Sequence, residues 1–517
     1  MTKTFPALPE AGHKAYFCWA VFDERFEMGQ IKTNLFCVLF FIFIFSAQSL
    51  ALAAEMSYSA FPELFDSEDL LWEIKLGSHQ YTIPIIDDGQ LFIGIDDRNI
   101  DHPGVQSTGG GILMRLEPDT GKMVWQLPVP RNRAGRVGPA HFNIWRCGVC
   151  SQPVFDGKRL YIVGPRGDVL CIDRNGQADG NDGPFKSEAE YMQADSGYKL
   201  AKNDGDIIWR YDMLAGVDIT PHDVCGSTPL LVGDYIYACT SNGQDARHEY
   251  IVKPEAPALI VLDKNTGKLA AVEKEGISKE TFHCNWSSPV SAGVNGKTYI
   301  LFGGGDGILY AFEPVTETAD KPQVLKKIWE YDCNPPEYRV KDGKAQRYCS
   351  WRKRYPGGPS EIISIPAVYN GRVYVPIGQS PIHDPGQGML SCIDIATGKK
   401  VWESKEVDRT TAQPVIADGL LYISDYSGNL HCFDADTGEH CWTHDMGYGT
   451  WCASPYVSGG KVYISTERKV FWVLKAGREK QVLSRSKVKS PAITPLVDNG
   501  VFYLPTQKRL FAIEQRP

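Results

Sequence analysis

The 517-residue chain carries a formal net charge of −8, with 62 Asp and Glu against 54 Lys and Arg. Neutralising a nucleic-acid backbone requires clustered basic residues, so this balance argues against a nucleic-acid partner. The 50 Gly and 33 Pro favour a fold of many short strands and turns.

An apolar segment near the N-terminus has the layout of a secretory signal peptide. The run 35–45 is almost wholly apolar, follows Lys32 and leads to small residues around Ala53. A basic start, an apolar core and a small-x-small cleavage site are the parts of such a signal. We expect residues 1–53 to be removed, with Met28 as an alternative true start. The mature protein would be periplasmic or extracellular, without a stable membrane span. An uncleaved anchor is the alternative.

From residue 54 onward, a unit of four strand-like segments recurs. Its third segment ends in a turn of Asp, Thr and Gly, and the fourth carries a Trp, as in Asp434, Gly438 and Trp442. Four short strands at a regular period indicate a propeller blade. The second segment of each unit alternates aromatic and aliphatic residues, and eight copies occur: 91–95, 160–163, 235–239, 298–302, 373–376, 420–423, 462–464 and 501–504.

The two ends of the chain complete one blade between them. The last unit stops after its third segment, 510–513, while an isolated Trp-bearing segment, 70–76, precedes the first unit. Pairing these segments closes the ring and removes exposed sheet edges. The sequence therefore predicts an all-β, eight-bladed β-propeller over 54–517 as a single domain. The fourth-strand tryptophans recur with their turns, so we interpret them as packing between blades: Trp72, Trp125, Trp209, Trp329, Trp402 and Trp442.

The connections between strands sort onto two faces of the predicted ring. First-to-second and third-to-fourth turns share one face and are mostly tight. Second-to-third loops and blade-to-blade links share the other face, and they hold most of the insertions: 96–111, 126–150, 211–226, 243–257, 331–360 and 379–388. Long loops on a rigid scaffold are the usual place for binding. We call this side the insertion-rich face and expect the functional site there.

One insertion departs from this rule. Residues 174–206 lie between a third and a fourth strand, so we expect them to project from the opposite face. Oxygen-bearing side chains alternate from Asp173 to Asp182, but no acid stands at the twelfth position that a calcium loop requires. A polar turn network is the favoured interpretation.

Two groups of candidate ligand-binding residues lie on the insertion-rich face. In the first, His stands beside an acid in second-to-third loops of alternate blades, so a shared metal or anion site is one hypothesis and separate surface residues are the other. Its members are Asp101, His102, Arg247, His248, Glu249, His383 and Asp384. In the second, aromatic and Arg side chains surround the channel mouth, where they could stack on a flat or sugar-like ligand or simply fill the funnel. Its members are Trp145, Arg146, His222, Trp286, Trp351, Arg352 and Trp451.

The cysteines and the remaining motifs identify no catalytic centre. Cys147 with Cys150 and Cys333 with Cys349 are the better disulfide candidates, since each pair lies in one polar insertion. Nucleophile elbows, zincin motifs and phosphate loops are missing from the contexts that would support them. The residues assign no metal-ligand set.

The recurrent Asp-x-x-Thr-Gly-Lys-x-x-Trp pattern, as at Asp394 to Trp402, resembles the pyrroloquinoline-quinone-type β-propeller repeat family over about residues 70–517. That family includes quinoprotein alcohol dehydrogenases and non-catalytic propellers, such as the lipoprotein of the outer-membrane β-barrel assembly machinery. The dehydrogenases hold the quinone under a disulfide between adjacent cysteines and beside calcium, but this chain has no adjacent Cys pair.

The resemblance therefore implies an exported, non-catalytic binding or scaffold module, whose partner would be a protein or a carbohydrate-like ligand. The alternative is a quinoprotein oxidoreductase that uses pyrroloquinoline quinone and calcium. A fold shared by both kinds does not decide between them.

Overall fold

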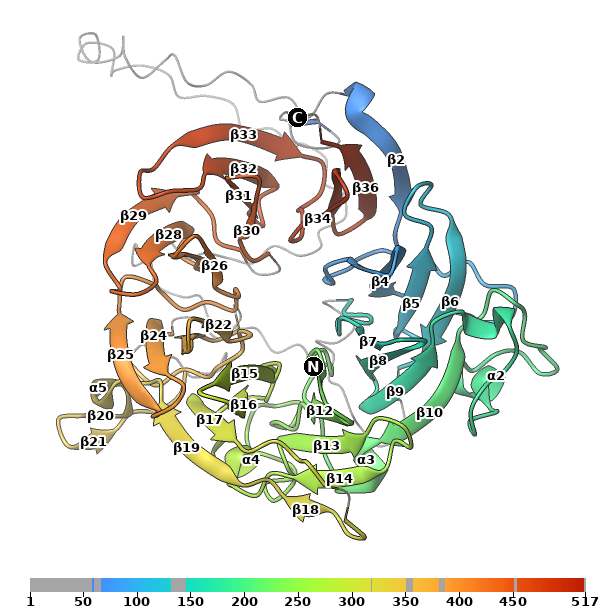
Figure 1. Ribbon diagram of the computed structural model, residues 1–517, viewed down its shortest axis with the longest axis horizontal. Helices are drawn as coiled ribbons and strands as arrows, with labels where there is room; N and C mark the ends of the chain where they lie inside the picture. Colours follow the sequence, from blue (N-terminus) through green and yellow to red (C-terminus); the bar gives the residue numbers. More distant parts are fainter. Residues whose placement is uncertain are drawn as a thin grey trace, which may run out of the picture. The chain divides into compact units, whose positions relative to one another are not determined.

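The computed structural model describes residues 58–59, 67–131, 146–317, 319–349, 357–380, 386–450 and 453–515. The expected signal peptide, 1–53, lies outside these residues. Ser57–Pro517 form one compact unit, in which eight mainly antiparallel sheets are arranged in a ring (Figure 1). The prediction of an eight-bladed β-propeller is confirmed.

The first four blades follow the chain in order, each with its innermost strand first (Figure 1). The first blade consists of β3 (Ile85–Asp87), β4 (Gln90–Asp96), β5 (Gly111–Leu116) and β6 (Met123–Val129), and the second of β7 (Val154–Asp156), β8 (Arg159–Gly164), β9 (Asp168–Asp173) and β10 (Asp206–Asp212). The third blade consists of β11 (Leu230–Val232), β12 (Tyr235–Cys239), β13 (Leu259–Asp263) and β14 (Leu269–Val272), with β18 (Gln323–Val324) added at its outer edge. The fourth blade consists of β15 (Val290–Val294), β16 (Lys297–Gly303), β17 (Ile308–Phe312) and β19 (Lys327–Asp332).

The next four blades repeat this arrangement. The fifth blade consists of β22 (Ala367–Tyr369), β23 (Arg372–Ile377), β24 (Met389–Asp394) and β25 (Lys399–Ser404), and the sixth of β26 (Val415–Ala417), β27 (Leu420–Ser424), β28 (Asn429–Asp434) and β29 (His440–Asp445). The seventh blade consists of β30 (Tyr456–Ser458), β31 (Lys461–Ser465), β32 (Val470–Lys475) and β33 (Val482–Val488), with β1 (Tyr58–Ser59) added at its outer edge. The eighth blade consists of β34 (Leu496–Asp498), β35 (Val501–Pro505), β36 (Arg509–Glu514) and β2 (Leu70–Lys75).

The eighth blade closes the ring as the sequence predicted. Strand β2, from the N-terminal side, pairs antiparallel with β36, with Trp72 opposite Ala512. The outer edge of the last blade is thereby covered by the first strand of the propeller. Closure is the arrangement that leaves a circular array without open edges.

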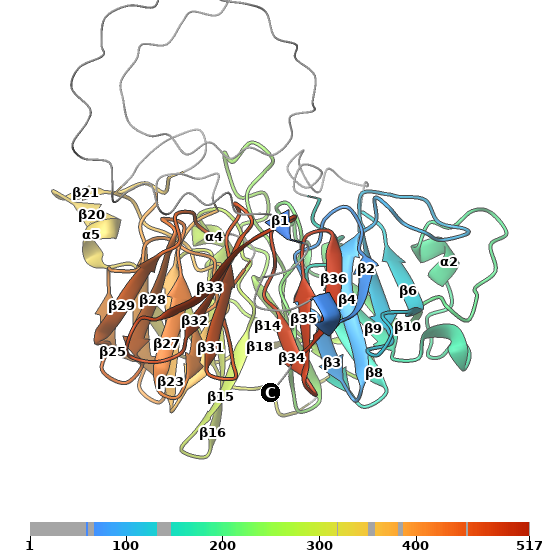
Figure 2. The same cartoon turned by 90° about the horizontal axis from the view of Figure 1, so that it is seen from above.

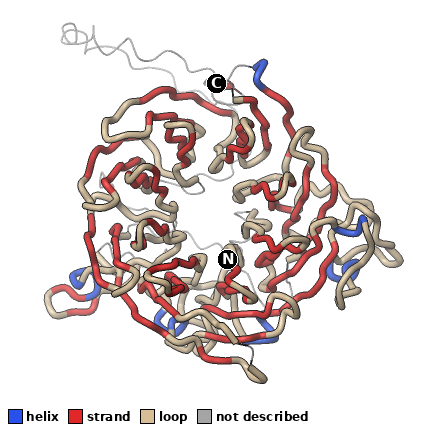
Figure 3. Tube along the Cα trace, viewed as in Figure 1, coloured by secondary structure: helices blue, strands red, loops and turns tan. Residues whose placement is uncertain are grey.

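The helices are short and lie in connections outside the blades (Figure 3). They are η1 (Ser67–Asp69), η2 (Gly176–Ala178), α2 (Glu188–Tyr191), α3 (Met213–Val217), α4 (Ile277–Glu280) and α5 (Pro336–Arg339). Figure 2 shows α4, α5 and the hairpin of β20 (Val340–Lys341) and β21 (Lys344–Ala345) at one side of the ring, while the β15–β16 turn extends from the other. The insertions thus gather on one face.

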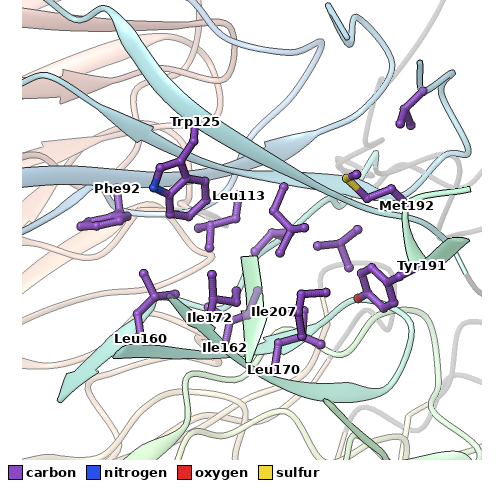
Figure 4. Close-up of a cluster of buried hydrophobic side chains, with 14 residues drawn as sticks. Phe92, Leu113, Trp125, Leu160, Ile162, Leu170, Ile172, Tyr191, Met192 and Ile207 are labelled. Atoms are coloured by element: carbon purple, nitrogen blue, oxygen red, sulfur yellow. The ribbon is translucent and has the colours of Figure 1, made fainter. Parts of the chain in front are cut away.

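The core lies between neighbouring blades, because second and third strands are buried on both of their faces. In Figure 4, Phe92, Leu113 and Trp125 of the first blade pack against Leu160 and Ile172 of the second. Outer strands face water on one side, and β19 accordingly alternates between half-buried and exposed residues. A strand that is buried on both faces requires a nearly continuous run of apolar residues, whereas a strand that is buried on one face requires apolar and polar residues in alternation.

A bulge and a tryptophan recur where third and fourth strands meet. Each of the eight pairs has a register shift there, which is a β-bulge or irregularity. A bulge re-aims the side chain beside it. Six indole N–H groups donate to carbonyl groups of the following blade: Trp72 to Pro118, Trp125 to Arg174, Trp209 to Lys264, Trp329 to Ile395, Trp402 to Ala435 and Trp442 to Gly477.

The expected direction of the insertion 174–206 is wrong. Its Asp195 amide donates to the Gly104 carbonyl at 2.8 Å, and Gly104 belongs to the β4–β5 loop on the insertion-rich face. The segment turns back because it buries Tyr191 and Met192 in the core between the first two blades. The acidic turn at its start is internally bonded, as when Asp206 accepts from the Asp182 amide at 2.7 Å. This bonding is the polar turn network that the sequence favoured.

Candidate functional site

The eight links between blades meet around one cavity of about 330 Å³ at the end of the central channel. Every link contributes to its wall: Thr82, Cys150, Thr228, Ser288, Ile365, Gln413, Ser454 and Thr494 are one residue from each. The described lining contains hydroxyl, amide, thiol, aliphatic and aromatic groups, one carboxylate, Asp223, and neither Lys nor Arg. The cavity is therefore suited to a neutral ligand that forms hydrogen bonds.

Several predicted ligand-binding residues can be placed relative to this cavity. Trp286 lines it, while His222 is buried behind it with its ring centroid 6.1 Å from that of Trp286. Six further candidates lie outside the described residues: Trp145, Trp351, Arg352, His383, Asp384 and Trp451.

The two described arginine candidates do not line the cavity. Arg146 is half-buried, and its Nη1 lies 3.4 Å from Nδ1 of His79. Burial and, secondarily, the positive charge of Arg146 lower the pKa of His79 to about 4. Arg247 is exposed in the β12–β13 loop, where its amide donates to Asp245 at 3.2 Å. These arginines therefore add no positive charge to the described lining of the cavity.

Beside the cavity, three histidines converge among the described residues. His222 lies in the β10–β11 link, His248 in the β12–β13 loop and His283 in the β14–β15 link, and all three are buried. Their ring centroids are 4.4 Å apart for His222 and His283, and 4.6 Å apart for each of the other two pairs. One nitrogen from each ring lies within 4.8 Å of the other two. The connections around the third blade thus bring three potential metal ligands together.

A backbone contact selects the tautomer of the neutral His222 ring. Its Nδ1 lies 2.8 Å from the carbonyl oxygen of Gln244. A carbonyl can only accept, so Nδ1 carries the hydrogen and, in the neutral ring, Nε2 keeps its lone pair. This tautomer makes His222 Nε2 available as a ligand atom.

A buried carboxyl group lies behind His283. The Glu361 Oε1 atom is 3.6 Å from His283 Nδ1 and accepts from the Tyr348 hydroxyl at 2.8 Å. Burial raises the pKa of Glu361 to about 8 against the smaller opposing effect of the Tyr348 hydrogen bond. A buried acid facing a histidine from its rear is a recurrent arrangement around metal-binding imidazoles.

The hypothesis of a shared site among second-to-third loops is only partly matched by the structure. His102 does not approach His248: its Nε2 lies 2.8 Å from Asp204 Oδ1, and its ring contacts Tyr198. His248 instead meets histidines from the neighbouring blade links.

The sequence interpretation missed His283 and Glu361. His283 shortly precedes Trp286, and His222 stands similarly before the preceding inner strand. This common placement before inner strands is a signal that could have paired His222 with His283. Glu361 has no comparable sequence signal, because its role depends on the packing of a link from the next blade.

The two cysteine pairs expected as disulfides are not bonded to each other. No disulfide joins Cys147 to Cys150 or Cys333 to Cys349. Cys333 is buried in the core between the fourth and fifth blades, where desolvation raises the pKa of its thiol. Cys147 and Cys150 both line the channel cavity. Placement in one polar insertion did not make these cysteines partners.

Across the described residues, no helix combines the length and apolar character needed to cross a membrane.

Comparisons with known proteins relate the chain to two kinds of propeller. Residues 386–516 match the family model described as outer membrane protein assembly factor BamB. The chain is also 22% identical over 393 residues to a polyvinylalcohol dehydrogenase of Sphingopyxis sp. strain 113P3. That match covers 68% of this chain and 46% of the dehydrogenase, so this chain spans less than half of that relative's length.

Solved structures of both kinds share the fold. BamB from Moraxella catarrhalis aligns with a TM-score of 0.53 and 14% identity over 86% of this chain and 99% of that chain. The quinohemoprotein alcohol dehydrogenase ADHIIG from Pseudomonas putida HK5 aligns with a TM-score of 0.51 and 13% identity over 88% of this chain and 78% of that chain. At these identities the structural likeness concerns the fold alone. Together, the comparisons confirm the resemblance to pyrroloquinoline-quinone-type repeat propellers that the repeats predicted.

Proposed function

We propose that this protein is an exported, non-catalytic binding module that holds a segment of a partner protein at its insertion-rich face. The observation that carries this proposal is the cavity formed by all eight blade links, whose described lining is rich in neutral hydrogen-bonding groups, with Asp223 as its one carboxylate. A peptide backbone presents neutral donors and acceptors that such a lining can satisfy. The match of residues 386–516 to an outer membrane protein assembly factor supports the same function.

Site-specific photocrosslinking tests this proposal. A photoreactive amino acid at Gln413, on the cavity wall, should crosslink one discrete protein in the native cells. The control is the same amino acid at Asp418, in the β26–β27 turn on the opposite face, which should not crosslink that protein. Equal labelling from both positions would contradict the proposal. Recovery of glycan instead of protein from Gln413 would identify the ligand as carbohydrate-like.

A quinoprotein oxidoreductase is the second candidate, favoured by the similarity to a polyvinylalcohol dehydrogenase. Pyrroloquinoline quinone carries three carboxylates, which require cationic partners when they leave water. The described cavity lining has no Lys or Arg, and the sequence has no adjacent Cys pair to cover the ring. The described residues of the cavity therefore do not fit this cofactor, and we derive no reaction through it.

The two candidates predict different results with added cofactor. Purified protein mixed with pyrroloquinoline quinone and calcium should neither shift the quinone absorbance nor reduce a dye in the presence of alcohols or sugars. Tight quinone binding with turnover would replace the binding-module proposal by an oxidoreductase.

Export is part of the same proposal and can be measured separately. N-terminal sequencing of the protein from fractionated cells should place the mature end just after Ala53, in the periplasmic or extracellular fraction. A start at or before Met28 in the mature chain would exclude cleavage at the expected site.

A further inference from the structure

The three-histidine cluster is the buried feature that the proposed binding function does not use. The exposed fractions of its members are 1% for His222, 9% for His248 and 0% for His283. Burying a polar ring is costly unless its nitrogen atoms find partners. Three buried imidazole rings from separate segments of the chain meet at this one point, and the Nε2 atom of one of them, His222, has no hydrogen-bond partner among the described residues.

We propose that His222, His248 and His283 bind one divalent transition-metal ion of the Zn²⁺ or Cu²⁺ type. Neutral imidazole nitrogens are preferred ligands of these ions. In a tetrahedral site with metal–nitrogen bonds of about 2.0–2.1 Å, ligand nitrogens lie roughly 3.3 Å apart. The three candidate nitrogens already lie within 4.8 Å of one another, so small side-chain rotations bring them to that spacing.

The surroundings of His222 match those of a metal ligand. Its Nδ1 atom donates a hydrogen bond to the Gln244 carbonyl oxygen, 2.8 Å away. The other ring nitrogen, Nε2, therefore keeps a lone pair that a metal ion can accept. Nε2 is buried and has no hydrogen-bond partner among the described residues. A bound cation would satisfy this atom.

His283 has an outer partner of the kind that orients metal-binding histidines. Glu361 Oε1 approaches its Nδ1 at 3.6 Å, and the same oxygen accepts from Tyr348. An acidic side chain beside the outer nitrogen of an imidazole helps to orient the ring. Glu361 is thus a positioning residue, which acts on the ion through His283.

Asp223 brings a carboxylate close to one of the three histidines. Its Oδ2 lies 3.7 Å from His222 Nε2, and the residue also lines the cavity. Both Asp223 and His248 have φ of +57°, a left-handed backbone that non-glycine residues adopt at a cost. A site with three protein ligands keeps one position open for water or another small ligand.

Binding of the ion would tie together the link before the third blade, a loop within it and the link after it. Trp286 contacts His283, with ring centroids 4.8 Å apart, and also lines the cavity. Metal binding would therefore hold this part of the cavity wall in place. This proposal does not depend on partner binding, since none of the three histidines lines the cavity.

The test measures zinc in the full-length exported protein, purified without a histidine tag. After removal of metal with a chelator and dialysis against Zn²⁺, we expect about one zinc per chain by elemental analysis. His248→Gln and His283→Gln should each weaken zinc binding at least tenfold, and the double variant should abolish it. Glu361→Gln should weaken binding by about 10- to 100-fold without changing the stoichiometry, as for other outer partners.

His431→Gln is the matched control, because His431 is another buried histidine with a carboxylate partner, Asp425, at 2.9 Å. It should retain the zinc stoichiometry and affinity of the wild type. A measurement on the unmodified chain makes the test independent of whether the variants fold. Added Co²⁺ should give the absorption bands of a tetrahedral nitrogen-ligated ion, and Zn²⁺ should displace the Co²⁺ and abolish these bands. Failure of the wild type to take up either ion, or unchanged binding in the double variant, would overturn the proposal.

Discussion

At the scale of single residues, the blades contain buried acids whose environment opposes ionisation. Asp306, in the β16–β17 turn, is 2% exposed and accepts from the Tyr310 hydroxyl at 2.6 Å and the Ile308 amide at 3.0 Å. Desolvation raises its pKa to about 7, although those hydrogen bonds and the charge of Arg339 oppose the shift. Asp306 therefore contributes to the pH dependence of stability.

Replacing Asp306 by Asn should remove this contribution. The folded state binds the proton more tightly than the unfolded state, so the stability from the neutral acid is complete below the unfolded pKa near 4. It is lost as the pH rises to about 7. The unfolding free energy of Asp306→Asn relative to wild type should therefore increase between pH 4 and pH 8, by up to about 4 kcal/mol. Urea unfolding of both proteins at several pH values measures this difference in unfolding free energy. A difference that does not change with pH would contradict a raised pKa for Asp306.

At the scale of the strand and its turn, the recurring unit couples each blade to the next. The tryptophan of one fourth strand lies against the glycine of the following blade's turn, where a side chain would not fit. A Cβ atom on Gly438 would lie 2.6 Å from the Trp402 ring, and one on Gly398 would lie 2.6 Å from Trp329. We propose that these contacts dock the blades, and that glycine recurs there both for its conformation and for the space.

Replacing Gly438 by Ala tests whether this turn needs glycine for its backbone conformation, for the space beside the tryptophan, or for both. Gly460 is the control, because it shares only the backbone conformation. Gly438 has φ of +75° and contacts Trp402, while Gly460 has φ of +69° and nothing within 4 Å of its missing Cβ. Both alanine variants should lose about 1–2 kcal/mol from the left-handed backbone. Only Gly438→Ala should lose about 1–3 kcal/mol more through overpacking. Equal losses in denaturant unfolding would show that the tryptophan contact does not restrict this turn.

Trp442→Ala should cost about 3–5 kcal/mol, as other truncations of large buried side chains do. Trp442 is 7% exposed, and its indole N–H donates to the Gly477 carbonyl at 2.9 Å. Trp442→Phe keeps most of the apolar contact and loses the hydrogen bond, so we expect a loss of about 1–2 kcal/mol. An unfolding midpoint unchanged in Trp442→Ala would refute a docking role.

At the scale of the whole propeller, one strand joins the two ends of the chain. Strand β2 covers the edge of β36, and Trp72 donates to Pro118 of the first blade at 2.7 Å. Without β2, the eighth blade would expose a strand edge that invites pairing with another molecule.

A chain that begins at Ser78 lacks β2 and should reveal this role. We expect a lower unfolding midpoint and concentration-dependent oligomers in light scattering, because β36 loses its antiparallel partner. A second chain that begins at Ser67 keeps β2 and serves as the control. Identical monomers of equal stability would show that closure does not depend on this strand.

The sequence by itself determined the blades, their number and their closure. Strand alternation and the turn before each Trp are local signals, set by side chains within a few residues of one another. Trp72 and the unit ending at 510–513 therefore indicated closure even though they lie at opposite ends of the chain. The order of the strands also predicted which connections share a face, because connections of one type lie on the same side of the ring.

Only the tertiary structure decided which side chains meet. His222, His248 and His283 belong to three connections, and they converge because neighbouring blades bring their links together. The same packing placed Glu361 behind His283, returned the insertion 174–206 to the insertion-rich face and left Cys333 in a core instead of a disulfide. Repeat patterns specify strands and turns locally, whereas loop paths depend on which apolar residues they bury and which neighbouring loops they contact.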